Sequence, residues 1–84
     1  MKGSVRPHAR GYWVIDWYHN GKHERFYSDF LHGGGKFWMR HHDKAKCIGY
    51  EMASRCLNQM RTDWEAYCRG ERAFDINKYR GSYT

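Results

Sequence analysis

The sequence contains one proline in 84 residues and no apolar stretch that approaches the length of a membrane span. Its first four residues lead into no hydrophobic region of the kind that a secretory signal requires. We therefore expect a cytoplasmic protein that makes no contact with a membrane.

The sequence also lacks the patterns of a disulfide framework and of a zinc site. Its three cysteines fall in one expected helix, where Cys47 and Cys56 would lie roughly 13 Å apart, beyond disulfide reach. His32, His41 and His42 lie near Cys47 in the sequence, but no CxxC or HxxxH pair supplies zinc-ligand spacing. We expect reduced thiols, no metal and no cofactor.

Catalytic motifs are missing as well. Glycines 33–35 precede Lys36 without the GxxxxGK[ST] spacing of a phosphate-binding loop, and no nucleophile elbow is present. No nucleophile with a base and no pair of carboxylates is grouped in the sequence, and a chain this short leaves little room for a pocket. We expect no catalytic residue and no enzyme activity, and we interpret residues 29–42 as an irregular connection.

Acidic residues are few compared with basic ones. Lysine and arginine total 15 against nine acids, a net charge of +6, which favours a polyanionic partner. The alternative is a solvated basic surface that serves only solubility.

Two runs rich in aromatic and β-branched residues, 12–19 and 22–28, are separated by Asn20-Gly21, the strongest short signal for a β-hairpin. A two-residue loop also sets the register. The expected pairs are His19 with Lys22, Asp16 with Arg25, Ile15 with Phe26, and Trp13 with Ser28.

Strand alternation assigns the side chains of this hairpin to two faces. The core face receives Trp13, Ile15, Trp17 and Phe26. The open face receives Tyr12, Val14, Asp16, Tyr18, His23, Arg25 and Tyr27. Residues 4–10 can form a third strand at the edge, where Pro7 is tolerated, and would add Arg6, His8 and Arg10 to the open face.

A long helix is expected over residues 43–70, with Asp43 as its N-cap and Gly70 as its terminator. Its apolar stripe consists of Ala45, Ile48, Gly49, Met52, Ala53, Cys56, Met60, Trp64 and Tyr67. The expected fold is α+β, a three-stranded antiparallel sheet packed against one long C-terminal helix. Residues 1–70 would form the domain, and residues 71–84 a linker toward a following core-binding domain.

The open face mixes cations with planar hydrogen-bonding groups, a surface that can enter the major groove of duplex DNA. Its candidate contacts are Arg6, His8, Arg10, Tyr18, His23, Arg25 and Tyr27. Basic residues at turns and segment ends could touch phosphates: Lys2, Lys22, Lys36, Arg40, His41, His42 and Lys44. Of these, Lys22, Arg40 and Lys44 are the favoured candidates. The alternative for Asp16 and Arg25 is that they only neutralise each other across the strands.

The order of these elements resembles the N-terminal arm-type DNA-binding domain of tyrosine recombinases, the integrase family of phages and bacteria. The similarity includes the Gly3-Ser4-Val5 edge strand, the strand begun by Trp13-Val14-Ile15, the Asn-Gly hairpin, the long helix and the junction-like residues 72–79. The resemblance implies a sheet in the major groove of arm sites, with Arg6, His8, Tyr18, His23 and Arg25 as DNA contacts. Catalysis would belong to a separate domain.

The sequence thus predicts a monomeric module that binds double-stranded DNA in a nucleoid-associated recombinase, beside other recombinase subunits. The alternative is a protein-interaction module that uses an aromatic face of Tyr12, Val14, Tyr18 and Tyr27. Binding of double-stranded RNA is a weaker third possibility, because side chains cannot read the narrow A-form major groove.

Overall fold

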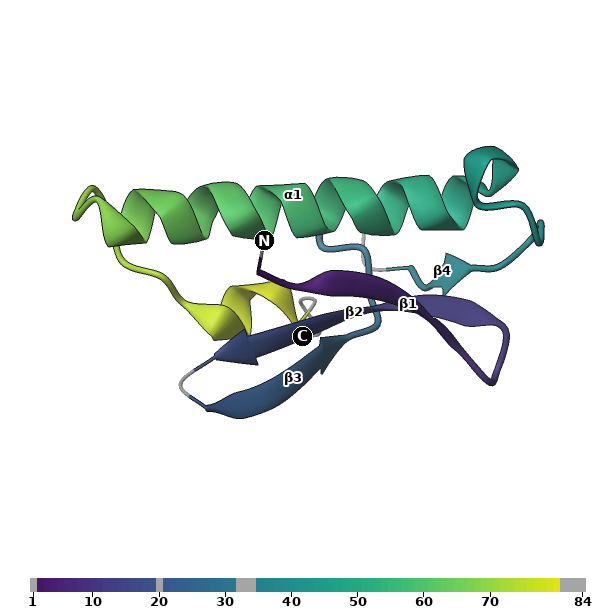
Figure 1. Ribbon diagram of the computed structural model, residues 1–84, viewed down its shortest axis with the longest axis horizontal. Helices are drawn as coiled ribbons and strands as arrows, with labels where there is room; N and C mark the ends of the chain where they lie inside the picture. Colours follow the sequence, from purple (N-terminus) through teal and green to yellow (C-terminus); the bar gives the residue numbers. More distant parts are fainter. Residues whose placement is uncertain (1, 20, 32–34, 81–84) are drawn as a thin grey trace.

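One helix of 21 residues lies across one face of a small antiparallel sheet (Figure 1). The structure is a computed structural model and describes residues 2–19, 21–31 and 35–80. Its strands are β1 (Ser4–His8), β2 (Tyr12–His19), β3 (Lys22–Phe26) and β4 (Phe37–Trp38); its helices are the 3-10 turn η1 (Lys44–Lys46), α1 (Ile48–Cys68) and the 3-10 turn η2 (Ile76–Tyr79). The predicted α+β class, an antiparallel sheet against one long helix, is confirmed.

The hairpin has the predicted register over most of its length. β2 pairs with β3 through Ile15 and Phe26, Asp16 and Arg25, and on to the pair beside the turn. Gly21 has a φ of 77°, the positive angle that the turn prediction requires, and Asn20 lies outside the described residues. β1 pairs with the other side of β2 and is an edge strand, as Pro7 indicated.

The pairing predicted between Trp13 and Ser28 is wrong. β3 ends at Phe26, and Trp13 pairs instead with Phe37 of β4, which continues along the same side of β2. An isolated β-bridge joins Ser28 and Lys36 in the segment between β3 and β4. The physical reason is burial: the position opposite Trp13 points into the core, and the fully buried ring of Phe37 fills it where a serine would not. Of the predicted glycine-rich connection, residues 32–34 lie outside the described residues.

The helix begins later than predicted. Asp43 accepts a hydrogen bond from the Ala45 N–H (3.0 Å) and so caps η1, while Cys47 is the N-cap residue of α1. The predicted end is confirmed, because Gly70 follows α1 with a φ of 75°.

The buried stripe of α1 is also displaced from the predicted one. Ala45, Ile48 and Tyr67 are exposed, whereas Leu57, Asp63 and Ala66 are buried in their place. Two segments account for part of this shift: Tyr79 of the tail contacts Asp63, and Leu57 lies beside Gly3, just before β1.

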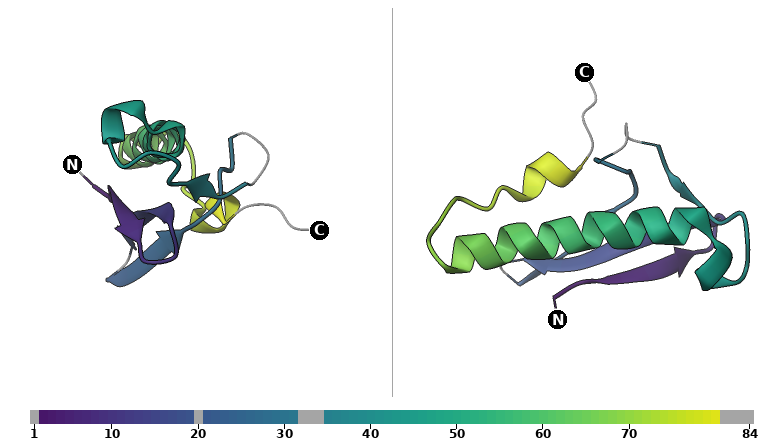
Figure 2. Two further views of the ribbon diagram at one scale, coloured as in Figure 1. Left: turned by 90° about the vertical axis from the view of Figure 1, so that its right-hand side faces the viewer. Right: turned by 90° about the horizontal axis from the view of Figure 1, so that it is seen from above.

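Residues 71–80, which we expected to be part of a linker, lie against the same core (Figure 2). Tyr79 is fully buried, and Phe74 stacks on Trp17 with ring centroids 5.8 Å apart. The packed core therefore draws on both ends of the chain. No helix among the described residues combines the length and apolar character that a membrane span requires.

Candidate functional site

The sheet has an outer face, the one turned away from α1, and no described helix or strand lies over it (Figures 1 and 2). Three of the four side chains that β2 sends to this face are nevertheless buried: Tyr12, Val14 and Asp16 are 6%, 2% and 5% exposed, whereas Tyr18 is 61% exposed. Our expectation that these three lie open is wrong. Side chains from the flanking strands lie over two of them: His8 stacks on Tyr12, and Arg6, His23 and Arg25 contact Asp16.

Three cationic or titratable side chains converge on Asp16. The Nε atoms of Arg6 and Arg25 lie 3.0 Å and 3.1 Å from its carboxylate oxygens, and Nε2 of His23 lies 3.0 Å from Oδ1. We call these four residues the Asp16 cluster. The cross-strand pair of Asp16 and Arg25 is present, and it is one part of a larger arrangement in which β1 also takes part.

The Asp16 cluster is open on its outer side. The side chains of Arg6, His23 and Arg25 are 68%, 37% and 47% exposed, whereas that of Asp16 is 7% exposed. Both arginines reach the carboxylate through Nε, and within the described residues their terminal nitrogens donate no hydrogen bond to another group. The carboxylate is therefore covered while several N–H donors face outward.

The exposed Tyr18 borders the cluster at the hairpin end. Tyr18 stacks on His23 with ring centroids 4.8 Å apart and an angle of 20° between the rings. Tyr18, His23, Arg6 and Arg25 line one shallow hollow with Asp16 at its floor. The structure thus brings together four of the predicted DNA contacts.

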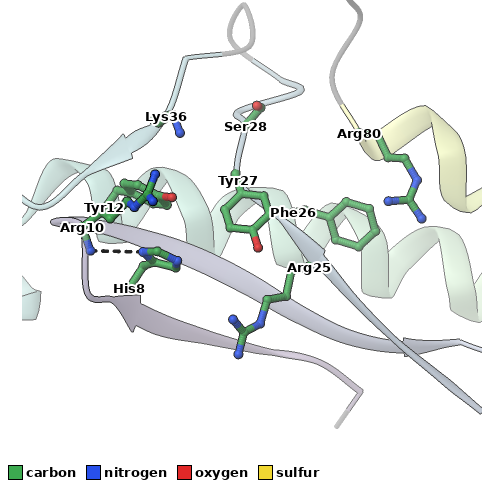
Figure 3. A pocket seen from close by; sticks show the side chains of 9 residues that line it. All are labelled: His8, Arg10, Tyr12, Arg25, Phe26, Tyr27, Ser28, Lys36 and Arg80. Carbon is green, nitrogen blue, oxygen red and sulfur yellow. Dashed lines mark hydrogen bonds between the residues drawn. The ribbon is translucent and has the colours of Figure 1, made fainter.

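A second hollow, which we call the Tyr12 hollow, lies at the other end of β2 (Figure 3). Its volume is about 570 Å³, and it is lined by His8, Arg10, Tyr12, Arg25, Phe26, Tyr27, Ser28, Lys36 and Arg80. His8 stacks on Tyr12 at 4.6 Å, and Nζ of Lys36 lies 4.4 Å from the centre of the same ring. The predicted contacts His8, Arg10 and Tyr27 meet here, without a carboxylate among the lining residues.

The remaining predicted contacts do not join either hollow. Lys22 is exposed beside the hairpin turn. Arg40 lies with Trp38 and Ile48 near the start of α1. Nζ of Lys44 lies 5.4 Å from the ring centre of Tyr50, on the side of the sheet that carries the helix. Lys44 is therefore placed away from the outer face.

Two further basic residues line the Tyr12 hollow: Lys36, which the sequence placed behind Lys22, Arg40 and Lys44 as a phosphate contact, and Arg80, which was not predicted. Lys36 reaches the hollow because the segment after β3 returns to the sheet, and Arg80 reaches it because the tail folds back. Arg80 forms an ion pair with Glu24 and lies over the ring of Phe26. Neither position has a local sequence signal, since both depend on contacts between distant segments.

No group of three or more histidine, cysteine or acidic side chains within the described part of the chain is arranged to hold a metal. His32, one of the histidines considered in the sequence, lies outside that part.

The chain was also compared with known proteins. No family model, no curated protein and no solved structure matches it. Its function is therefore inferred from the chemistry of the outer face.

Proposed function

We propose that this chain binds duplex DNA by laying the outer face of its sheet in the major groove. The observation that carries the proposal is the Asp16 cluster, in which one buried carboxylate holds Arg6, His23 and Arg25 side by side on an uncovered sheet face. The major groove is wide enough to admit a small β-ribbon, whose side chains then reach base edges.

The arrangement favours base reading because it is held in place before binding. Ordering a free arginine costs conformational entropy, and the contact of each Nε with Asp16 reduces that cost. The outward N–H groups suit the O6 and N7 acceptors of guanine. An exposed carboxylate on the binding face would repel the phosphates of DNA. Asp16 is buried, and the cations around it would lie between its charge and the DNA.

The role in the cell that fits best is docking of a larger protein on DNA. The similarity to the arm-type domain of tyrosine recombinases supports this role, with the sheet in the groove and the helix behind it. We infer that the module helps a recombinase bind sites outside the crossover region, together with other recombinase subunits in the nucleoid, and carries out no catalysis itself.

A titration against duplex DNA at several salt concentrations tests the proposal. Arg6→Ala and Arg25→Ala should each weaken binding to a preferred sequence by about 1 to 3 kcal/mol and relax the preference among sequences. Arg55→Ala is the matched control, because Arg55 pairs with Glu51 on an exposed part of α1. Duplex binding that ignores salt, or equal losses in all three variants, contradicts the proposal.

For the alternative function, a protein-interaction module, the exposed aromatic surface is smaller than the sequence predicted. Of the four residues expected in its aromatic patch, Tyr12 and Val14 are buried and only Tyr18 and Tyr27 are exposed. An interaction module should be more sensitive to Tyr18→Ala and Tyr27→Ala than to Arg6→Ala and Arg25→Ala, whereas a DNA-binding module should be more sensitive to the arginine changes. A partner protein that binds wild type but not the tyrosine variants, with DNA binding absent, would favour the interaction module.

A further inference from the structure

We propose that the Tyr12 hollow holds a phosphodiester group of the bound nucleic acid. This inference rests on the proposed function and deepens it, because it assigns different tasks to the two ends of the outer face. The Asp16 cluster at the hairpin end would read base edges, and the Tyr12 hollow at the other end would grip the DNA backbone.

The first argument is the way in which positive charge is assembled. Arg10 comes from the turn between β1 and β2, Arg25 from β3, Lys36 from the residue before β4, and Arg80 from the residue after η2. Four separate segments thus place a basic side chain around one hollow (Figure 3). Like charges repel one another when gathered in this way, and an anion in the hollow relieves the repulsion.

The second argument concerns which of these charges are already neutralised. Arg25 pairs with Asp16, and Arg80 pairs with Glu24. For Arg10 and Lys36, the described residues provide no carboxylate within ion-pair distance, and none of the lining residues is acidic. These two side chains are therefore the ones that a phosphate would neutralise.

The third argument is that the aromatic floor is not available to a base. The ring of Tyr12 has His8 stacked on it, Lys36 close to its centre, and the edges of Tyr27 and Trp38 about it. A nucleobase that entered the hollow would find no free ring face of Tyr12 on which to stack. The groups that remain are cationic N–H donors, which match a phosphate and not an apolar ligand.

Aromatic contacts also position the ammonium of Lys36 and the backbone of Arg10. Lys36 is held over Tyr12 by a cation–π contact, and the backbone N–H of Arg10 donates to Nδ1 of His8 (3.1 Å), the ring that stacks on Tyr12. The backbone of Arg10 and the ammonium of Lys36 are thus tied to the same tyrosine.

The test measures duplex affinity as a function of salt for the double variant Arg10→Gln/Lys36→Gln. The slope of log K against log salt depends on the number of phosphates neutralised, so loss of the one phosphate held in the hollow should reduce it by about 0.9. The preference among DNA sequences should stay unchanged, because phosphate contacts carry no base information. The matched control is Lys46→Gln/Arg55→Gln, which removes the same charge from two exposed residues that do not line the hollow.

Two further measurements complete the test. Lys36→Arg, which keeps the charge, should keep the slope of wild type and so separates a loss of charge from a loss of packing on Tyr12. In amide NMR spectra, inorganic phosphate as the probe should shift the resonances of Arg10 and Lys36 in wild type and leave the double variant unchanged, which would show that the hollow binds phosphate without the rest of the DNA.

The outcomes distinguish this inference from the proposed function. If the hollow variant and its charge-matched control change the slope equally while Arg6→Ala and Arg25→Ala still weaken binding, the phosphate assignment is overturned and DNA binding stands. If wild type does not bind duplex DNA at all, both proposals are overturned.

Discussion

The hydroxyl of Tyr79 donates a hydrogen bond to Oδ2 of Asp63 and so links the tail of the chain to the C-terminal part of α1. Both residues are buried. Asp63 also accepts a hydrogen bond from Nε2 of Gln59 (3.0 Å) and has Nζ of Lys78 at 3.3 Å. Because the tail also delivers Arg80 to the Tyr12 hollow, this contact links the stability of the fold to the shape of the outer face.

Tyr79→Phe should lower the free energy of unfolding by about 1 to 3 kcal/mol, because it removes a donor from a buried charged acceptor without leaving a cavity. Urea unfolding followed by fluorescence measures the change. Tyr67→Phe is the matched control, since Tyr67 lies exposed on α1 and should be neutral. Equal stability of the two variants would show that the hydrogen bond contributes nothing.

Stability should fall at acid pH because of Asp63. Burial by itself raises the pKa of this carboxyl, but hydrogen bonds from Tyr79, Gln59 and Lys78 outweigh burial and hold the pKa below its usual 3.8. A group whose pKa is depressed in the folded state stabilises the fold above its unfolded pKa, and this contribution is lost as the pH falls through the folded pKa. The free energy of unfolding of wild type should therefore decline below about pH 4.

Asp63→Asn isolates that effect. The variant should be less stable than wild type at neutral pH, and the difference should shrink as the pH is lowered. The hydrogen bond from Arg69 lowers the pKa of Glu71 in the same direction, but Glu71 is present in both proteins and cancels from the difference. A difference that stays constant with pH would show that Asp63 is not the group responsible.

Gly49→Ala should destabilise the fold although alanine is the better helix former. A Cβ at this position would lie 2.2 Å from the backbone oxygen of Trp38 and 2.9 Å from the carbonyl carbon of Phe37, so α1 and β4 would have to move apart. Overpacking of this kind costs about 1 to 3 kcal/mol. Thermal unfolding measures it against Gly35→Ala, which meets no atom within 4 Å and should be near neutral.

The three cysteines should differ in their reaction with iodoacetamide at about pH 8. Cys68 is exposed and should react in the folded protein, whereas Cys47 and Cys56 are buried and should react only when the structure opens. Burial, with the help of Asp29, raises the pKa of Cys56 to about 12.

Cys47 should react before Cys56 once the structure opens locally. Burial raises its pKa, but hydrogen bonds from the backbone N–H of Tyr50 and the indole N–H of Trp13 outweigh that effect and lower the pKa to about 7. Mass spectrometry over time should show one fast and two slow modifications. Cys68→Ser serves as the control, and a fast modification that persists in this variant would contradict the assignment.

Local pattern in the sequence was sufficient for the hairpin, for its core side and for the end of the helix. Asn20-Gly21 and strand alternation predicted the pairing of Ile15 with Phe26 and the burial of Trp17, because both depend on residues close together in the chain. The same register brings Asp16 and Arg25 opposite each other. This part of the candidate site therefore follows from the local sequence alone.

Only the tertiary structure decided which segment pairs with β2 beyond the end of β3 and which residues line the Tyr12 hollow. Phe37 replaces Ser28 beside Trp13, and Lys36 lines the Tyr12 hollow, because the segment between β3 and β4 returns to the sheet. Arg80 lines the same hollow because the tail folds back from the far end of α1. Tyr12 is covered partly by Trp38 and Lys36 of the same returning segment, whereas Asp16 is covered by Arg6, His23 and Arg25 of the two strands beside it. Sequence periodicity reports which way a residue points, whereas its exposure depends on which other side chains lie over it.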